Sequence, residues 1–285
     1  MTISMKRAAF LLSGTIAAGM YGSVSLAADV ETSTALPAVS GPNGKVEIGG
    51  GWADIDDLSS DEVFRGGAAF SFPVGDMFGI QADLTALDVF GDTTVGGAVH
   101  FFTRDPNSYL LGVYGGYVDG GPANIWHIGP EAELYLDNVS IEAVGGYMDI
   151  SNDGGGEFYA MGKLALYATD NLRLSVGASS VANFESANAG LEWFMGDTGF
   201  PASLTFEGRL GEDGFSSVMA GLSLYFGGED KSLIRRHRED DPRLYFFDIF
   251  SSGFLGSIKP PGNTQPTCDN DPETEDIPYC DTQID

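Results

Sequence analysis

The chain has 285 residues, of which 41 are acidic and 14 are basic, giving a formal net charge of −27. A chain this acidic is a poor partner for nucleic acid, so nucleic-acid binding is excluded from the functions considered. Glycine supplies 40 residues, yet hydrophobic residues make up 43% and aromatic residues 12% of the chain. This composition favours sheet structure over disorder.

The N-terminus has the pattern of a secretory signal peptide. Lys6 and Arg7 precede an apolar stretch, and small residues stand at Ser25 and Ala27. We therefore expect residues 1–27 to be a signal peptide, followed by a linker over residues 28–44. After it, no apolar run reaches the roughly 20 residues that a membrane helix needs.

Residues 45–226 alternate between apolar and polar side chains and turn at Asp or Asn. The hairpin "AELYLDNVSIEAVGGY", for example, turns at Asp137-Asn138 and places Glu133 opposite Glu142. The pattern predicts an all-β fold of about twelve strands, with 8–14 also compatible, and helical periodicity between them is absent. Pro130 would remove a ladder hydrogen bond within one strand, so we expect a bulge at Gly129-Pro130. The expected strands lie near 45–54, 63–73, 78–90, 94–103, 109–118, 124–136, 139–149, 158–168, 171–180, 184–195, 201–210 and 216–226.

Aromatic residues gather at the two ends of the expected strands. One set lies beside the Asp/Asn turns: Phe72, Phe78, Phe102, Tyr109, Tyr135, Tyr167, Trp193, Phe194 and Phe226. The second set lies at the opposite strand ends: Trp52, Phe64, Phe90, Tyr117, Trp126, Tyr147, Phe158, Phe184 and Phe215. A soluble sandwich or a soluble barrel also alternates, but two aromatic bands around an aliphatic belt are typical of a membrane barrel.

These bands, the alternation and the final strand "GLSLYF" at 221–226 resemble bacterial outer-membrane β-barrel proteins of the porin-like class. The resemblance implies a closed antiparallel transmembrane β-barrel over residues 45–226, inserted by the barrel-assembly machinery among outer-membrane lipid and lipopolysaccharide. An even strand number places both barrel ends on one side, expected to be periplasmic. The chain departs from the pattern because residues 227–285 follow the last strand.

Ten charged residues are expected to face the lumen and to set its ion preference. About twelve strands leave a narrow opening, so the first function considered is a passive pore or structural barrel with a mild preference for cations. In a narrow lumen the same charges would pair into a salt-bridged plug. The ten residues are Glu47, Arg65, Asp83, Glu133, Glu142, Lys163, Arg173, Glu192, Glu207 and Arg209.

The loops opposite the short turns are rich in carboxylates. Asp54, Asp56, Asp57 and Asp61 are candidate contacts for a divalent cation, since hard cations favour carboxylate oxygens. The stretch lacks the EF-hand pattern, however, and the sequence favours a solvated edge over a defined metal site. The alternative function is therefore a surface binding or adhesion barrel that uses this acidic rim.

Catalysis has little support in the sequence. His100, His127 and His237 are the three histidines, and none stands in a recognisable nucleophile–base pattern. We expect His100 in the lumen and His127 near the outer rim. Neither an enzymatic activity nor a cofactor is predicted.

Residues 227–285, the C-terminal tail, contain the densest positive cluster of the chain, formed by Lys231, Arg235, Arg236 and Arg238. This cluster is expected to pack at the periplasmic mouth or to enter the acidic lumen as a plug; a tether that touches nothing is the alternative. Cys268 and Cys280, the only cysteines, are expected to form one disulfide in an exported protein.

Overall fold

The structure is a computed structural model that describes residues 36–55, 58–89, 92–119, 124–151, 156–196, 201–212, 214–227, 231–240, 243–245 and 249; the side chains of 55, 58–61, 89 and 92 are not included. The signal peptide, Phe90, Asp56, Asp57 and both cysteines therefore lie outside the described residues, as does the side chain of Asp61.

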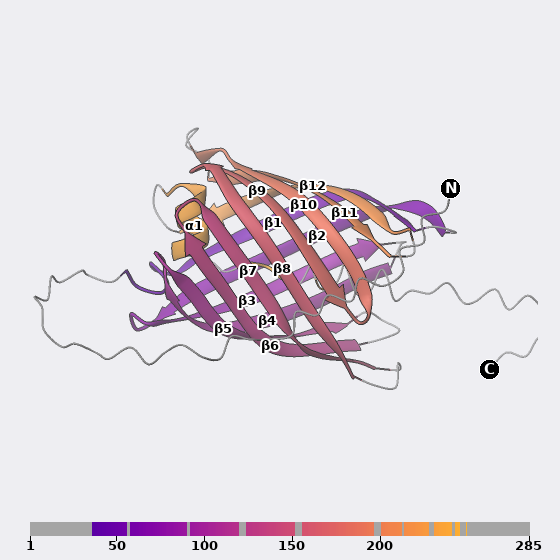
Figure 1. Cartoon of the computed structure of the whole chain (residues 1–285), viewed down its shortest axis with the longest axis horizontal. Helices are drawn as coiled ribbons and strands as arrows, with labels where there is room; N and C mark the ends of the chain where they lie inside the picture. The colour runs from indigo at the N-terminus through magenta and orange to yellow at the C-terminus, as the bar shows by residue number, and fades with distance from the viewer. Residues whose placement is uncertain are drawn as a thin grey trace, which may run out of the picture. The chain divides into compact units, whose positions relative to one another are not determined.

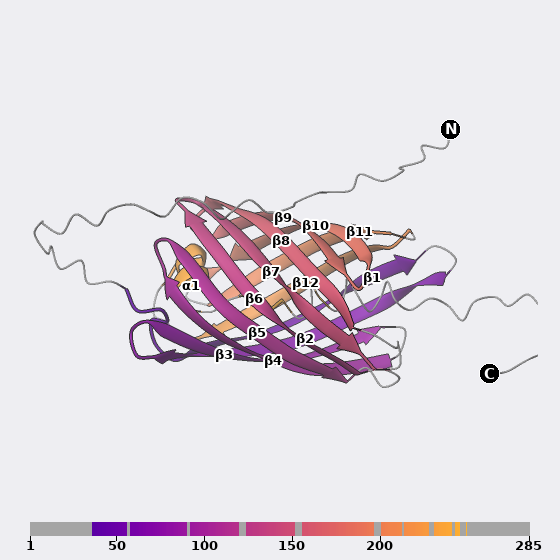
Figure 2. The ribbon, with the colours of Figure 1, turned by 60° about the horizontal axis from the view of Figure 1, so that its bottom comes forward.

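Twelve antiparallel strands form one closed barrel, in which each strand pairs with the next and β12 pairs with β1 (Figures 1 and 2). The predicted fold class and strand order are confirmed. The strands are β1 (Asn43–Ile55), β2 (Leu58–Val74), β3 (Phe78–Val89), β4 (Asp92–Asp105), β5 (Tyr109–Asp119), β6 (Asn124–Leu136), β7 (Val139–Ile150), β8 (Gly156–Thr169), β9 (Leu172–Val181), β10 (Phe184–Phe194), β11 (Ala202–Gly211) and β12 (Ser216–Phe226). A short helix, α1 (Leu233–Glu239), follows them.

Strand register follows the turns that the sequence predicts. Leu136 pairs with Val139 across the Asp137-Asn138 turn, and Glu133 pairs with Glu142. Asp137 takes a positive φ of 48°, which aspartate tolerates better than most residues.

The bulge expected at Gly129-Pro130 is wrong. The pairs on either side of it, Ile128 with Tyr147 and Glu131 with Val144, keep one register, so no extra residue is inserted. Glycine instead allows β6 and β7 to approach closely beside Pro130, because a Cβ added at Gly129 would lie 1.9 Å from the carbonyl oxygen of Gly145. Register shifts occur elsewhere, between Ala53 and Ile55 of β1 and between Tyr167 and Thr169 of β8.

The outer face of the barrel is apolar. Large hydrophobic side chains on every strand remain open to the surroundings, for example Ile48 at 61%, Leu84 at 63% and Val176 at 56% exposure. A continuous apolar surface of this extent around closed strands is suited to lipid rather than water. Within the described residues, no helix is long and apolar enough to span a membrane.

The two aromatic bands are confirmed only in part. Trp52, Phe64, Phe72, Phe78, Tyr109, Tyr117, Trp126, Tyr147, Phe158, Trp193 and Phe226 are exposed on the outer face. Six others are buried and face inward, so their assignment to the bands is wrong: Phe102, Tyr135, Tyr167, Phe184, Phe194 and Phe215. The reason for five of them is parity, because side chains alternate between the two faces of a strand and these five stand at inward positions. Phe215 stands just before β12 and packs against Phe184.

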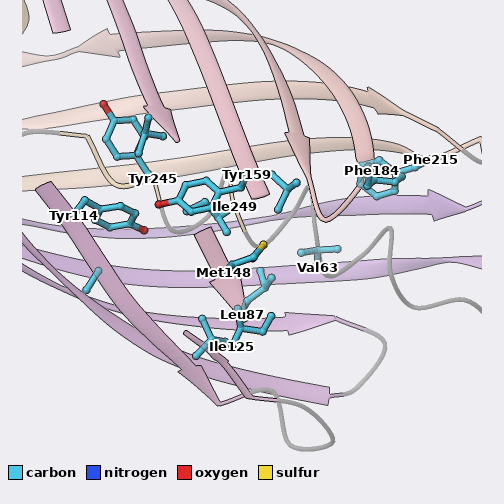
Figure 3. Close-up of a cluster of buried hydrophobic side chains, with 14 of the residues drawn as sticks. Val63, Leu87, Tyr114, Ile125, Met148, Tyr159, Phe184, Phe215, Tyr245 and Ile249 are labelled. Atoms are coloured by element: carbon cyan, nitrogen blue, oxygen red, sulfur yellow. The ribbon is translucent and has the colours of Figure 1, made fainter. Parts of the chain in front are cut away.

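The barrel interior holds the core of the molecule. One apolar cluster in the interior includes Val63, Leu87, Ile125, Met148 and Tyr159, and the tail residues Tyr245 and Ile249 belong to it (Figure 3). Smaller clusters near the short turns bring together wall side chains with Val39 from the N-terminal segment and with Leu233 from α1. The interior of the barrel is therefore packed with residues from outside the strands.

Candidate functional site

The candidate site is the charged lumen together with the chain segments that enter it. All ten predicted lumen residues stand at inward-facing positions of their strands, and six of them, Asp83, Glu133, Glu142, Arg173, Glu192 and Arg209, are buried. Their effect on ion preference stays a prediction.

Sequence reasoning missed three buried charges at the same inward parity: Lys45, Arg104 and Glu131. Each stands two residues from another inward side chain, so the period of two was the signal that could have found them. They change the charge balance of the lumen wall. The predicted set has six acidic and four basic residues, and the set with these three has seven acidic and six basic residues.

His100 on β4 is held between two buried carboxylates. Its Nε2 lies 3.0 Å from Oδ2 of Asp83, and its Nδ1 lies 2.8 Å from Oε2 of Glu131; all three side chains are fully buried. A carboxylate accepts hydrogen bonds, so a ring that serves two of them donates from both nitrogens and is an imidazolium. Gln81 donates a further hydrogen bond of 2.8 Å to Oδ1 of Asp83. We refer to Asp83, His100 and Glu131 as the histidine clamp.

The clamp reaches across a strand. Asp83 is on β3 and His100 on the adjacent β4, whereas Glu131 is on β6, beyond β5. Gly112 on β5 leaves the space for this contact, because a Cβ there would lie 2.6 Å from Oε1 of Glu131. The small residue therefore lets a carboxylate from β6 reach a ring on β4.

His127 lies inside the barrel, so its expected place at the outer rim is wrong. The side chain is 2% exposed, and its ring packs 4.8 Å from Tyr114 and 5.9 Å from Tyr159. Its neighbour Trp126 takes the outward position, which leaves the inward one to the histidine. Neither ring nitrogen has a hydrogen-bond partner among the described residues.

The facing glutamates of β6 and β7 have different partners. Glu142 accepts a 2.6 Å hydrogen bond from Arg173 and lies 3.3 Å from Nε of Arg243, a tail residue. Glu133 lies 3.5 Å from the hydroxyl of Tyr245, also in the tail. A separate group joins Glu207 to Arg209 at 3.0 Å and to Lys163 at 3.9 Å. Side-chain donors of the wall and the tail therefore surround these carboxylates.

The helix α1 sits inside one end of the barrel (Figures 1 and 2). Its first residue, Leu233, is fully buried and packs against Tyr167, Phe194 and Tyr225 of the wall. The backbone nitrogens of Leu233 and Ile234 donate to the β8–β9 turn, at 3.1 Å each. Arg236, His237 and Arg238 fall in the last turn, where positive charge interacts favourably with the helix dipole.

Arginines of α1 bind aromatic rings at the barrel mouth. Arg236 lies 5.1 Å from the ring centre of Phe194 and 5.3 Å from that of Tyr225. Arg238 lies 5.0 Å from the ring of Tyr135 and 5.7 Å from that of Tyr167. Such cation–π contacts strengthen when water is excluded.

Two further residues of α1 differ in what they touch. His237 lies 2.9 Å from the hydroxyl of Tyr167 and 3.5 Å from Glu192, which are both wall residues. Arg235, by contrast, is 56% exposed at its side chain and pairs with Glu239 of the same helix. Of the three predicted cations within α1, Arg235 is therefore the one whose contacts among the described residues do not reach the wall; Lys231, which precedes the helix, contacts Ser40, Glu239 and Asp240.

The N-terminal segment closes the same mouth. Arg104 on β4 donates to the backbone oxygen of Ala38 at 2.6 Å and to that of Asp240 at 2.9 Å. Lys231 donates to the hydroxyl of Ser40 and to Asp240, each at 2.6 Å. We call residues 38–40 together with residues 231–240 the cork.

The pKa of Glu239 reflects its place in the cork. Burial would raise this pKa, but hydrogen bonds from Arg235 and Lys231, together with the positive charge of both, hold it below its ordinary value of 4.5. The carboxylate is thus charged over the neutral range and keeps both partners.

Beyond the cork, the chain continues into the lumen. Leu244, Tyr245 and Ile249 are buried. Tyr245 packs edge-on against Tyr114, with ring centres 5.9 Å apart (Figure 3). Its ring centre lies 6.3 Å from that of His100. The tail therefore touches both the histidine clamp and the facing glutamates.

Only one of the four acidic rim candidates has a described side chain. Asp54 is exposed, and the other three candidates lie in the part of the chain whose side chains are not described. Among the described residues, no group of three His, Cys, Asp or Glu could hold a metal ion. Cation binding at the rim stays a prediction.

No protein-family model and no curated protein matches the sequence. Among solved structures, the chain is similar to the KdgM porin in complex with disordered oligogalacturonate, with 7% identity over 64% of this chain and 99% of that chain, at a TM-score of 0.51. It is also similar to Omp33 of Acinetobacter baumannii (10% identity, 65% and 99% coverage, TM-score 0.42) and to outer membrane phospholipase A from Escherichia coli (12% identity, 65% and 92% coverage, TM-score 0.43). At these identities the likeness concerns the fold, which is that of outer-membrane β-barrels.

Proposed function

We propose that this protein is an outer-membrane barrel pore whose narrow lumen is closed by its own cork. The observation that carries the proposal is the placement of α1 and residues 243–245 inside a barrel with a charged wall and an apolar outer face. The likeness in fold to the KdgM porin is consistent with it. The mouth that holds the cork is expected to open to the periplasm.

The contacts of the cork suit a reversible closure. They are mostly hydrogen bonds and cation–π contacts of Arg104, Arg236 and Arg238 with backbone oxygens and rings, with one anchoring leucine, Leu233. Each arginine contributes roughly 1–3 kcal/mol. Since 1.4 kcal/mol changes a population tenfold, the loss of two arginines would raise the share of open molecules by a factor of about 30 to 2 × 10⁴.

We infer that the mild cation preference belongs to the open form. With the tail inside, Arg236, Arg238 and Arg243 add positive charge to a wall of seven acidic and six basic residues. Withdrawal of the tail removes these cations and leaves the carboxylates of β6 and β7 facing the lumen.

Planar-bilayer recordings test the proposal. The mature chain is compared with a deletion of residues 231–285 and with the double variant Arg236→Ala and Arg238→Ala. We expect the mature chain to conduct rarely, and both variants to show longer open times and reversal potentials shifted towards cation selectivity.

The matched control is Arg235→Ala, which removes one positive charge from α1, half the charge lost in the double variant, without removing a wall contact among the described residues. It should behave as the parent chain does. If the deletion leaves conductance unchanged, or if Arg235→Ala opens the barrel as much as the double variant, the cork does not close a pore.

A further inference from the structure

A polar cavity of about 90 Å³ remains in the lumen, between the tail and the wall formed by β1, β2 and β8–β12. About 10–15 Å³ accommodates one water molecule, so this cavity has room for several waters or one small solute. Arg243 and Leu244 of the tail form part of its lining. The cavity thus exists only where the tail is inside the barrel.

The cavity is positively charged, although the chain as a whole carries a net charge of −27. Five basic residues line it: Lys45, Arg65, Lys163, Arg173 and Arg243. Three glutamates also line it, so the difference, 5 − 3, is an excess of two positive charges, without counting His237.

Nearby charges leave this excess unchanged. Glu142 pairs with Arg173 and Arg243 from just outside the lining, and Arg209 pairs with Glu207. Including both Glu142 and Arg209 adds one charge of each sign, giving 6 − 4, again an excess of two. The wall of the histidine clamp has the opposite balance, with two carboxylates around one imidazolium.

Arg173 is the residue best placed to bind a ligand. Its side chain is 4% exposed, and its Nη2 donates to Glu142 at 2.6 Å. Its Nε is buried with no hydrogen-bond partner among the described residues. A buried arginine donor without an acceptor is costly, and an oxyanion would satisfy it through a charge-assisted hydrogen bond.

We propose that this cavity binds a small, doubly charged oxyanion of the size of inorganic phosphate, with Arg173 and Arg243 as its principal contacts. The excess of two charges matches a dianion, and oxygen acceptors match the arginine donors. The inference rests on the proposed function only in that the tail stays in the lumen; it does not require conduction. It extends that function by naming the solute class that the closed barrel holds.

Isothermal titration calorimetry on the mature chain, refolded in detergent micelles, tests the site with inorganic phosphate at constant ionic strength. We expect saturable binding of one phosphate per chain, competition by sulfate, and at least tenfold weaker binding in Arg173→Gln. Lys163→Gln provides a second variant, because its pair with Glu207 is longer, at 3.9 Å, and its removal disturbs the fold less. It should also weaken binding.

Arg235→Gln is the matched control, since it removes one charge from an exposed side chain outside the cavity lining. It should bind phosphate as the parent chain does. Absence of saturable binding, unchanged affinity in both lining variants, or equal loss in Arg235→Gln would each overturn the site.

Bilayer recordings separate this inference from the proposed function. Phosphate binding in micelles combined with an unchanged conductance after tail deletion would support the site and refute the cork. A deletion that opens the barrel while the mature chain binds no phosphate would refute the site alone.

Discussion

His100 gives the sharpest test of the structure, because one buried cation serves two buried carboxylates. Replacing it by leucine in the variant His100→Leu keeps a side chain of similar size but leaves Asp83 and Glu131 without their imidazolium. Removing one partner of a buried charge pair costs about 3–5 kcal/mol, because the remaining charge has no compensation.

The structure sets where in this range the cost should fall. Asp83 keeps the hydrogen bond from Gln81, whereas Oε1 of Glu131 already has no partner among the described residues. Most of the loss should therefore come from Glu131. We expect a destabilisation of about 3–4 kcal/mol for His100→Leu, and a partial recovery when Glu131→Gln is added to it.

His127→Leu is the matched control, since it makes the same substitution at a buried histidine whose ring nitrogens lack partners within the described part of the chain. It loses ring packing against Tyr114 and Tyr159, worth about 0.5–1.5 kcal/mol per pair, and also removes unsatisfied polar atoms, which offsets the loss. Its stability should stay within about 1 kcal/mol of the parent chain.

Equilibrium unfolding of the barrel in lipid vesicles, followed by the fluorescence of the three tryptophans, measures all four proteins. If His100→Leu costs less than about 1 kcal/mol, or if His127→Leu costs as much as His100→Leu, then His100 does not compensate the charges of Asp83 and Glu131.

Three further predictions concern the outer face, the strand pairing and the cork. Leu84→Arg, near the middle of β3 and 63% exposed, should destabilise the barrel in vesicles by about 2–4 kcal/mol in unfolding titrations if that face meets lipid. Gly146→Ala should reduce the yield of the heat-modifiable folded form, because its Cβ would lie 2.1 Å from a carbonyl oxygen of β6; Gly162→Ala, whose nearest contact is at 3.9 Å, should not. Because the folded pKa of Glu239 is lowered, its contribution to holding the cork is fully present above pH 4.5 and is lost as the pH falls through that lower pKa. Limited proteolysis of the tail with an acid-active protease should therefore accelerate as the pH falls below 4.5, and Glu239→Gln should remove this pH dependence.

The sequence by itself determined the strands and the two faces of the wall. A period of two assigns every side chain to one face, and the Asp-Asn turn fixes the register of β6 against β7, so the inward position of Glu133 and Glu142 followed directly. The same rule explains the errors. Position along the strand predicts that Phe102 and Tyr135 belong to an aromatic band on the outer face, whereas parity places both side chains inside the barrel, where they are buried.

Only the tertiary structure decided what fills the lumen. Arg243 meets Glu142 and Tyr245 approaches Glu133 across more than a hundred residues of chain, a separation over which no periodicity operates. Arg104 joins the segment that precedes β1 to the residue that follows α1, because barrel closure brings both to one mouth. The positive cavity likewise arises from charges of six strands and the tail that closure brings around one space. Local pattern determines which way a side chain points, whereas its partners depend on which distant segments the closed barrel brings within a few ångströms.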